Sequence, residues 1–455
     1  MANNWLYSYL RALIRFWVKF FFKQLSVLDA NLIPKEGPLL IILNHPNNLL
    51  DSVLIASVMP RKIHFLATGQ LFKNPILASI LTAAGAIPVY RKQDGGDEEK
   101  NKQAFARVTE VLQKGGVVAI YPEGITHSDP FLHKIKTGAA RMALQAEAES
   151  NFQLGLKIMP IGINFLARKS FQRTVTINFG QPIQPFTSPV SPSEEREATI
   201  KLTNQLQEAL EGELLNIEEI GIQPIVQDIE EIYKAHVTKQ LHKEGNSERA
   251  EAFTLSQRII DAVEFYQRYF PEKFAELHTS IKNYKRKRDY LELPESAFRR
   301  EFKEGFSTDG YSLILIEGLI GLPFFLYGIT QHLLPYFLPR LISHFASRKE
   351  TDYATIRFLA SIIAFPLFYA LQTSLVLIKL GWLAALCYLI SLPFIGAYAI
   401  RYFGGLQYFR NRIHLLYLFL NQRGRLKRLV QERELLIGQL DKARKVFLEH
   451  ENKLL

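Results

Sequence analysis

The chain has 455 residues, of which 48% are hydrophobic and 22% are charged. This length exceeds a single compact core, so two or more units are expected. The formal net charge of +11 favours an anionic partner. Long apolar spans indicate that this partner is a phospholipid surface. Nucleic acid is not expected, because the chain has neither zinc-finger spacing nor an RNA-binding motif. The only cysteine, Cys387, excludes a disulfide framework within the chain.

Residues 1–30 are predicted to form an amphipathic helix on the membrane surface. Basic residues recur at every fourth position, at Arg11, Arg15, Lys19 and Lys23, among bulky apolar side chains. Such a helix can place aromatic rings in the acyl boundary and cations against phosphate. The same pattern also suits a surface helix packed on its own domain. A signal peptide is not expected, because the charges interrupt its apolar core.

Residues 31–190 are predicted to form an α/β domain with a sheet flanked by helices. Apolar runs typical of buried strands occur at 39–43, 62–67, 117–121, 158–163 and 174–179. Helical patterns lie among them at 51–58, 75–84, 100–114 and 138–148. In such a domain, functional residues are expected in the loops beyond the ends of the strands.

Residues 191–306 are predicted to form a charged helical segment. They are rich in Glu, Lys, Arg and Gln at helical spacing. The densest basic cluster is 282–288, with the sequence Lys-Asn-Tyr-Lys-Arg-Lys-Arg. It could be a solvated helix face or a contact with lipid head groups.

Residues 307–403 are predicted to form a membrane region with two or three apolar spans. The stretches 313–338, 358–378 and 382–400 are each long enough to cross a hydrocarbon core of about 30 Å. Basic residues lie before the first stretch, after it and after the last. A re-entrant first stretch and a two-helix hairpin turning at 379–381 would keep all of them, and the α/β domain, on the cytoplasmic side.

Residues 404–455 are predicted to form an amphipathic helix. Beyond Arg425, apolar residues recur at roughly heptad intervals among charges. This stripe could pair two chains in a coiled coil and so make a homo-oligomer, or the helix could fold back on the domain.

The segment 44–51, Asn-His-Pro-Asn-Asn-Leu-Leu-Asp, directly follows the predicted strand 39–43. His45 would lie in the loop beyond the strand, and Asp51 at the start of the next helix could hold one imidazole nitrogen. The other nitrogen would then be free to take a proton from a hydroxyl group. Alternatively, Asp51 only caps its helix and His45 is an ordinary loop residue.

Three later segments carry further groups of chemical interest. Residues 85–91 end in the cation Arg91, and 121–128 contain Glu123 and Gly124 after a predicted strand. Lys136 follows, and Pro160 lies in the predicted strand 158–163. Arginine and lysine can bind a phosphate, and glycine permits the close approach of a ligand.

The order of these segments resembles the glycerolipid acyltransferase superfamily, whose first motif has a His and an Asp separated by four residues. Here five residues separate His45 from Asp51. This spacing is similar to the fungal-type glycerol-3-phosphate/dihydroxyacetone-phosphate acyltransferases and their bacterial relatives, with Asn47 inside the motif. Other matching segments are 85–89 with Arg91 and Asp94, 122–124 with His127, Lys136 with Gly138, 162–165, and 179–183. Ile125 departs from the Gly favoured in that branch.

The resemblance implies a membrane-bound acyltransferase with His45 as the general base and Asp51 as the residue that orients it. Arg91 would bind the acceptor's phosphate with help from Lys136, while Glu123 and Gly124 would shape the acceptor site. Pro160 would position its strand beside the acyl chain. The implied donor is acyl-CoA or acyl-carrier protein, and the implied acceptor is glycerol 3-phosphate or dihydroxyacetone phosphate. The reaction would need no metal and no other cofactor.

Two alternatives to this function remain open. The first is a 1-acylglycerol-3-phosphate (lysophospholipid) acyltransferase, with the same chemistry and a larger acceptor. The second is a non-catalytic membrane scaffold that keeps the fold. The His45 and Asp51 pair argues against the scaffold, because a scaffold does not use a base held by a carboxylate.

Overall fold

The computed structural model describes the chain in segments separated by short gaps. The described residues are 4–22, 24–90, 98–127, 129, 131–166, 174–185, 194–215, 222–241, 248–295, 298, 309–347 and 349–454. They form two compact units. The first unit comprises 1–218 and 347–358, and the second comprises 219–346 and 359–455.

A mixed seven-stranded sheet forms the centre of the first unit. Its strands are β1 (Gln24–Leu28), β2 (Leu39–Leu43), β3 (Ile63–Thr68), β4 (Ile87–Val89), β5 (Val117–Ile120), β6 (Lys157–Leu166) and β7 (Thr174–Phe179), in the spatial order β1-β7-β6-β2-β5-β3-β4. Neighbouring strands are parallel except for the antiparallel pair β6 and β7. Every residue of β2 is buried, as expected for a parallel strand covered on both faces.

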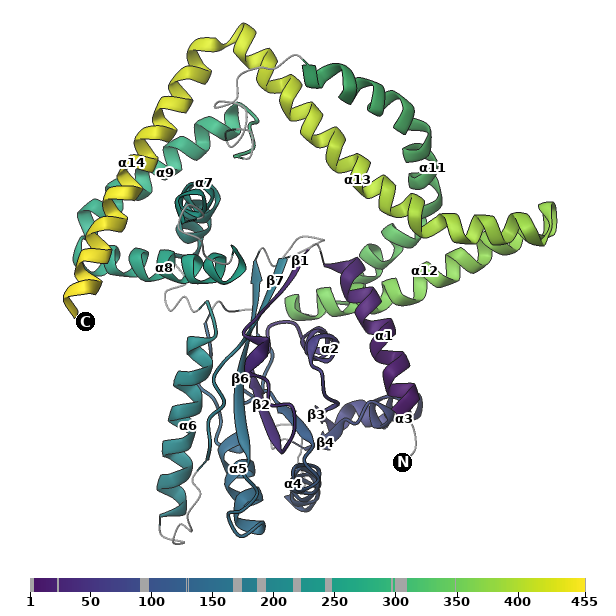
Figure 1. The fold of residues 1–455 in the computed structure, drawn as a ribbon, viewed down its shortest axis with the longest axis vertical. Helices are drawn as coiled ribbons and strands as arrows, with labels where there is room; N and C mark the ends of the chain where they lie inside the picture. Colours follow the sequence, from purple (N-terminus) through teal and green to yellow (C-terminus); the bar gives the residue numbers. More distant parts are fainter. Residues whose placement is uncertain are drawn as a thin grey trace. The chain divides into compact units, whose positions relative to one another are not determined.

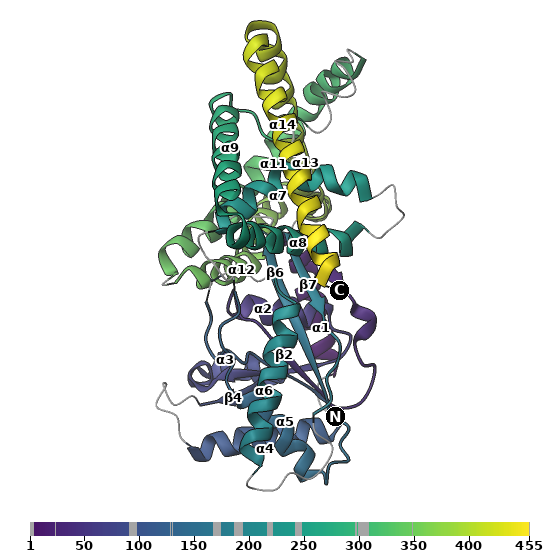
Figure 2. The ribbon, with the colours of Figure 1, turned by 90° about the vertical axis from the view of Figure 1, so that its left-hand side faces the viewer.

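Helices cover both faces of this sheet (Figures 1 and 2). Helices α1 (Asn4–Phe21) and α2 (Leu49–Val58) pack together on one face, and α5 (Gly138–Glu149) and α6 (Glu195–Gly212) lie on the other. Helix α4 (Glu98–Gln113) shares the apolar core with α5 and α6. Helix α3 (Pro75–Ala83) and the short 3₁₀ helices η1 (Ala30–Leu32) and η2 (Gly69–Lys73) complete the unit. The predicted α/β sheet flanked by helices is therefore confirmed.

The long apolar strands agree with their predictions, whereas two short strands do not follow from the sequence pattern. The strands predicted at 39–43 and 174–179 begin and end as expected, and β6 extends beyond the predicted 158–163 at both ends. Strands β1 and β4 have only five and three residues. Helix α1 ends at Phe21, and residues 24–28, included in the 1–30 segment, pair with β7 at the sheet edge.

Arg11 and Arg15 of the predicted basic stripe contact the end of α2, and Lys23 lies outside the described residues. Nε of Arg15 donates to the carbonyl of Ser57 over 2.7 Å, and the guanidinium of Arg11 donates to the carbonyls of Met59 and Pro60. The carbonyl of Ser57 lies in the last turn of α2, and those of Met59 and Pro60 lie just beyond its end, where a cation stabilises them. Trp17, Val18, Phe21 and Phe22 are buried, while Tyr9, Leu13 and Phe16 stay exposed. One face of α1 therefore packs on its own domain, while Tyr9, Leu13 and Phe16 leave apolar surface exposed on the helix.

The end of α6 lies against β6 and β7 because two glycines leave room for it. A Cβ atom on Gly162 would lie 1.9 Å from the carbonyl oxygen of Glu213, and one on Gly180 would lie 2.4 Å from Oε1 of Glu213. Nδ2 of Asn164 donates to that carbonyl over 3.0 Å. Burial, together with the nearby Asp29 carboxylate, raises the pKa of Glu213 to about 6. Helix α6 thus belongs to the sheet domain, although its sequence reads as part of the charged segment 191–306.

The second unit is helical. It contains α7 (Gln223–Leu241), α8 (Glu248–Tyr269), α9 (Pro271–Tyr290), α11 (Asp309–Ala346), most of α12 (Glu350–Leu380), α13 (Trp382–Asn421) and α14 (Arg423–Leu454). Leu426, Leu429, Leu436 and Leu440 of α14 are buried, and α14 contacts α7, α8 and α9. The apolar stripe of α14 therefore packs against other helices of the same chain, in the manner of the interpretation in which the helix folds back.

Part of the basic cluster 282–288 forms ion pairs inside the second unit. Lys285 pairs with Asp228, Lys287 with Glu432 at 2.7 Å, and Arg288 with Glu231 at 2.9 Å. Arg288 is buried, and it also lies 3.6 Å from the buried carboxylate of Glu295. These cations hold α9 to α7 and α14, so a role in binding lipid head groups is not needed to account for them.

Two helices of the described chain are long and apolar enough to cross a membrane, Glu350–Leu380 and Trp382–Gln407. Less than a quarter of each apolar window is buried by protein, at 17% and 22%. They are separated by Gly381, whose φ of 82° lies in the left-handed region that glycine adopts readily. The break after Leu380 agrees with the turn predicted at 379–381. In α11, Pro323, Pro335 and Pro339 lie inside the helix.

Candidate active site

The site forms where two neighbouring parallel strands end. In the pairing of β2 with β5, Ile42 lies opposite Ile120. Because parallel strands end at the same edge of the sheet, the loop that carries His45 after β2 lies next to the loop that carries Glu123 after β5. The backbone N–H of His45 donates to Oε1 of Glu123 over 3.3 Å. The sheet topology thus joins two segments separated by 78 residues.

His45 and Asp51 form the predicted pair. Nδ1 of His45 lies 2.9 Å from Oδ2 of Asp51, which also accepts the N–H of Asn47 over 2.8 Å. Asp51 is fully buried, and this burial raises the pKa of its carboxyl group despite the hydrogen bond from His45. An ionised carboxylate can only accept, so this contact keeps a proton on Nδ1. The lone pair of a neutral imidazole is then on Nε2, which has no hydrogen bond in the described part of the chain.

Tyr121 holds the imidazole from one side. The rings of His45 and Tyr121 stack with centroids 3.8 Å apart and planes inclined by 15°. The hydroxyl of Tyr121 lies 2.7 Å from Oγ of Ser52, the residue after Asp51. Desolvation and the nearby Asp51 raise the pKa of the Tyr121 phenol well above its usual value, so the ring stays neutral. Stacking on one face and a carboxylate at one edge leave His45 little freedom to rotate.

Glu123 is a buried carboxylate that organises the second loop. Besides the N–H of His45, it accepts the backbone N–H of His133 over 3.0 Å and contacts Nε2 of His127. Only 2% of the residue is exposed. Its position next to the base therefore depends on donors that come from three places in the sequence.

Gly124 and Lys136 lie together beside Glu123. The backbone N–H of Lys136 donates to the carbonyl of Pro122 over 2.8 Å. Gly124 has a φ of +69°, and a Cβ atom on it would lie 2.8 Å from Nζ of Lys136. Glycine at this position thus allows the ammonium group to lie against the loop.

The other two predicted site residues have different outcomes. Pro160 lies on β6 opposite Ile42, three residues before His45, and its carbonyl accepts the N–H of Gly180 over 2.9 Å. It is part of the sheet next to the site. Arg91 lies outside the described residues, as does Asp94.

Sequence reasoning missed Thr355, which supports the first loop from about 300 residues away. Oγ1 of Thr355 donates to the carbonyl of Asn47 over 2.7 Å and accepts the N–H of Leu50 at 3.3 Å. Nδ2 of Asn48 donates to Oδ1 of Asp352, one turn earlier in α12. These contacts are within the first unit, which contains 347–358. Thr355 precedes the predicted apolar stretch 358–378, and no sequence pattern links it to the loop of His45.

Residues 24–164 match the family model described as Acyltransferase. An uncharacterized acyltransferase of Schizosaccharomyces pombe is 20% identical over 53% of this chain and 49% of its own length. Glycerol-3-phosphate O-acyltransferase 1 of Saccharomyces cerevisiae is 25% identical over 42% of this chain and 24% of its own. The 1-acyl-sn-glycerol-3-phosphate acyltransferase of Bacillus subtilis is 26% identical over 27% of this chain and 58% of its own.

The matched region thus spans about half the length of the fission-yeast relative and a quarter of the budding-yeast one. Among solved structures, the 1-acyl-sn-glycerophosphate acyltransferase of Thermotoga maritima covers 46% of this chain and 83% of its own. That match has 17% identity and a TM-score of 0.32, a likeness too weak to support a conclusion.

Proposed function

We propose that this chain, whose residues 24–164 match the acyltransferase family model, transfers a fatty acyl group to glycerol 3-phosphate or dihydroxyacetone phosphate. The donor is acyl-CoA or acyl-carrier protein. The observation that carries the proposal is the contact of 2.9 Å between His45 and Asp51, with Nε2 of His45 left as a base. The budding-yeast relative, named a glycerol-3-phosphate O-acyltransferase, supports this acceptor.

In the proposed reaction, Nε2 of His45 removes the proton of the acceptor hydroxyl as its oxygen attacks the thioester carbonyl carbon. The new C–O bond forms, the C–S bond breaks, and the imidazolium gives its proton to the departing thiolate, which restores Nε2 of His45 as a base. Asp51 stabilises the positive ring and keeps Nδ1 protonated throughout. The enzyme forms no covalent intermediate, because the hydroxyl of the acceptor is itself the nucleophile. The reaction uses no metal and no further cofactor.

Acceptor binding is proposed for residues of the segments that follow His45 in the sequence. Lys136 and Arg91 supply cations for the phosphate, which suits a dianionic ligand. Glu123 and Gly124 shape the loop of the acceptor site, and Pro160 positions β6 beside the acyl chain. The close approach of Lys136 to Gly124 supports the assignment of Lys136.

We also propose that the enzyme is bound to the membrane with the first unit on the cytoplasmic side. Support comes from the two apolar helices Glu350–Leu380 and Trp382–Gln407 and from the exposed Tyr9, Leu13 and Phe16 on α1. A membrane location suits an enzyme whose product carries an acyl chain. It also brings the positive chain close to anionic phospholipid.

The test is acyl transfer in membranes containing the wild-type chain or His45→Ala. Labelled glycerol 3-phosphate, dihydroxyacetone phosphate and lysophosphatidate are each offered with acyl-CoA and with acyl-carrier protein. We expect product from one of the first two acceptors, with a rate at least about 100-fold lower in His45→Ala.

Product from lysophosphatidate alone would overturn the acceptor and favour the activity named for the Bacillus subtilis relative. Equal rates in both proteins, or no product with any donor, would overturn the reaction and favour the non-catalytic scaffold.

Thr355→Val is expected to lower kcat by about tenfold with a smaller change in KM. Valine keeps the shape of the side chain but leaves the N–H of Leu50 without its acceptor, a loss of about 1–2 kcal/mol in holding the loop. Steady-state rates in the assay above measure this effect. Thr355→Ser keeps the hydroxyl and should restore most of the rate. If valine and serine give equal kcat values, Thr355 does not position the loop.

A further inference from the structure

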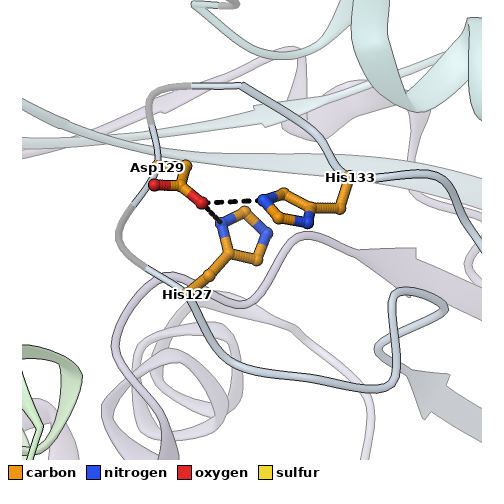
Figure 3. Close-up of side chains that lie close together, drawn as sticks. All are labelled: His127, Asp129 and His133. Atoms are coloured by element: carbon orange, nitrogen blue, oxygen red, sulfur yellow. Dashed lines mark hydrogen bonds and ion pairs between the residues drawn. The ribbon is translucent and has the colours of Figure 1, made fainter. Parts of the chain in front are cut away.

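The loop between β5 and α5 carries a cluster of two histidines and an aspartate. His127, Asp129 and His133 each offer one ligand atom, and these atoms lie within 4.8 Å of one another. Oδ2 of Asp129 is 2.8 Å from Nε2 of His133 and 3.7 Å from Nδ1 of His127. Figure 3 shows both rings directed toward the same carboxylate oxygen. The two rings have centroids only 3.9 Å apart.

The hydrogen bonding of His127 leaves one of its ring nitrogens without a hydrogen-bond partner among the described residues, at a place where a cation would bind. Its Nε2 contacts the buried carboxylate of Glu123, and an ionised carboxylate can only accept, so the proton is on Nε2. In a neutral ring, Nδ1 is then a bare acceptor. That atom is buried and makes no hydrogen bond in the described part of the chain, yet it faces a second carboxylate. An acceptor facing an acceptor is favourable only with a positive charge between them, which is either a second proton on the ring or a bound cation.

We propose that His127, Asp129 and His133 bind a divalent transition-metal ion, with Zn²⁺ as the best fit. Two imidazole nitrogens and one carboxylate oxygen are common ligands for this ion, and three protein ligands leave a position open for water or another ligand. Ligands at about 2.0–2.1 Å in a tetrahedron lie about 3.3 Å from one another. The observed separations of 2.8 and 3.7 Å are on either side of that value.

Glu123 completes the arrangement from outside the cluster. A histidine that binds a metal through one nitrogen usually donates its other N–H to a carboxylate, which fixes the tautomer. The contact of Nε2 of His127 with Glu123 has this form. Glu123 also accepts the N–H of His45, so the ion is linked to the loop of the base through one side chain. It would hold this loop in place and take no part in acyl transfer.

The site can be tested by Co²⁺ binding, which does not depend on activity. The purified full-length chain in detergent is stripped with a chelator and titrated with Co²⁺, and visible d–d absorption reports coordination by nitrogen and oxygen. Zn²⁺ is then added to displace the Co²⁺. Asp129→Ala and His133→Ala remove one ligand each, and Asp129→Asn is a near-isosteric alternative if alanine impairs folding. His278→Ala on the exposed face of α9 is the matched control.

We expect one Co²⁺ per chain, displaced by Zn²⁺, with unchanged affinity in His278→Ala. Loss of a carboxylate outside the ligand set typically lowers metal affinity by about 10–100-fold. Removing one of the three ligands should weaken Co²⁺ binding by more than this. Glu123→Gln should fall within that range. The proposal is overturned if no d–d band develops at about 100 μM Co²⁺, or if Asp129→Asn and His133→Ala bind as tightly as the wild type.

Discussion

Replacing Asp51 with asparagine is expected to lower kcat by about 10²–10⁴-fold, with little change in KM. Asparagine fits the same space, but Oδ2 is the single atom that contacts both Nδ1 of His45 and the N–H of Asn47. When the amide nitrogen takes the place of Oδ2, it donates to Nδ1 of His45 and no longer accepts the N–H of Asn47. The imidazole proton then moves to Nε2, and the atom that should remove the proton of the hydroxyl no longer has a lone pair. The initial rate of acyl transfer at saturating acceptor measures the loss.

The control for this prediction is a double-mutant cycle with His45→Ala. If Asp51 acts only by orienting and protonating His45, its replacement should cause no further loss once His45 is absent. An additional loss of tenfold or more in the double mutant would mean that Asp51 acts independently of His45. Circular dichroism of each variant checks that the buried site still folds.

Gly162→Ala is expected to destabilise the first unit by about 2–4 kcal/mol. The added Cβ would lie 1.9 Å from the carbonyl oxygen of Glu213, which is backbone and cannot rotate away. Either α6 moves off the sheet, or the hydrogen bond from Asn164 to that carbonyl is lost. The apparent melting temperature of the full chain in detergent, followed through the loss of acyl transfer after heating, should fall by about 5–15 °C.

Gly212→Ala is the matched control, because this glycine immediately precedes Glu213 and a Cβ on it would meet nothing within 4 Å. It ends α6, so alanine should be neutral or stabilising by up to about 1 kcal/mol. If both variants melt at the wild-type temperature, α6 does not depend on contact at Gly162. If both fall equally, the effect belongs to any substitution near Glu213.

The sequence by itself determined those elements in which every residue is apolar and buried. The five residues of β2 are all apolar because helices cover both faces of the sheet, and that run identifies the strand without other information. The pairing of His45 with Asp51 is equally local, because the loop and the first turn of α2 bring together residues six apart. The break at Gly381 is local as well, since glycine adopts its positive φ with little strain.

Only the tertiary structure decided which partners distant polar residues take. The basic stripe of α1 reads equally well as a set of phosphate ligands, but Arg11 and Arg15 contact the end of α2. Thr355 has no pattern that links it to Asn47, and Glu213 has none that links it to Gly162. Hydrophobic periodicity records whether a residue is buried, because burial depends on one side chain. A hydrogen bond or close contact depends on two groups that can be far apart in the sequence. Only the tertiary fold brings these two groups together.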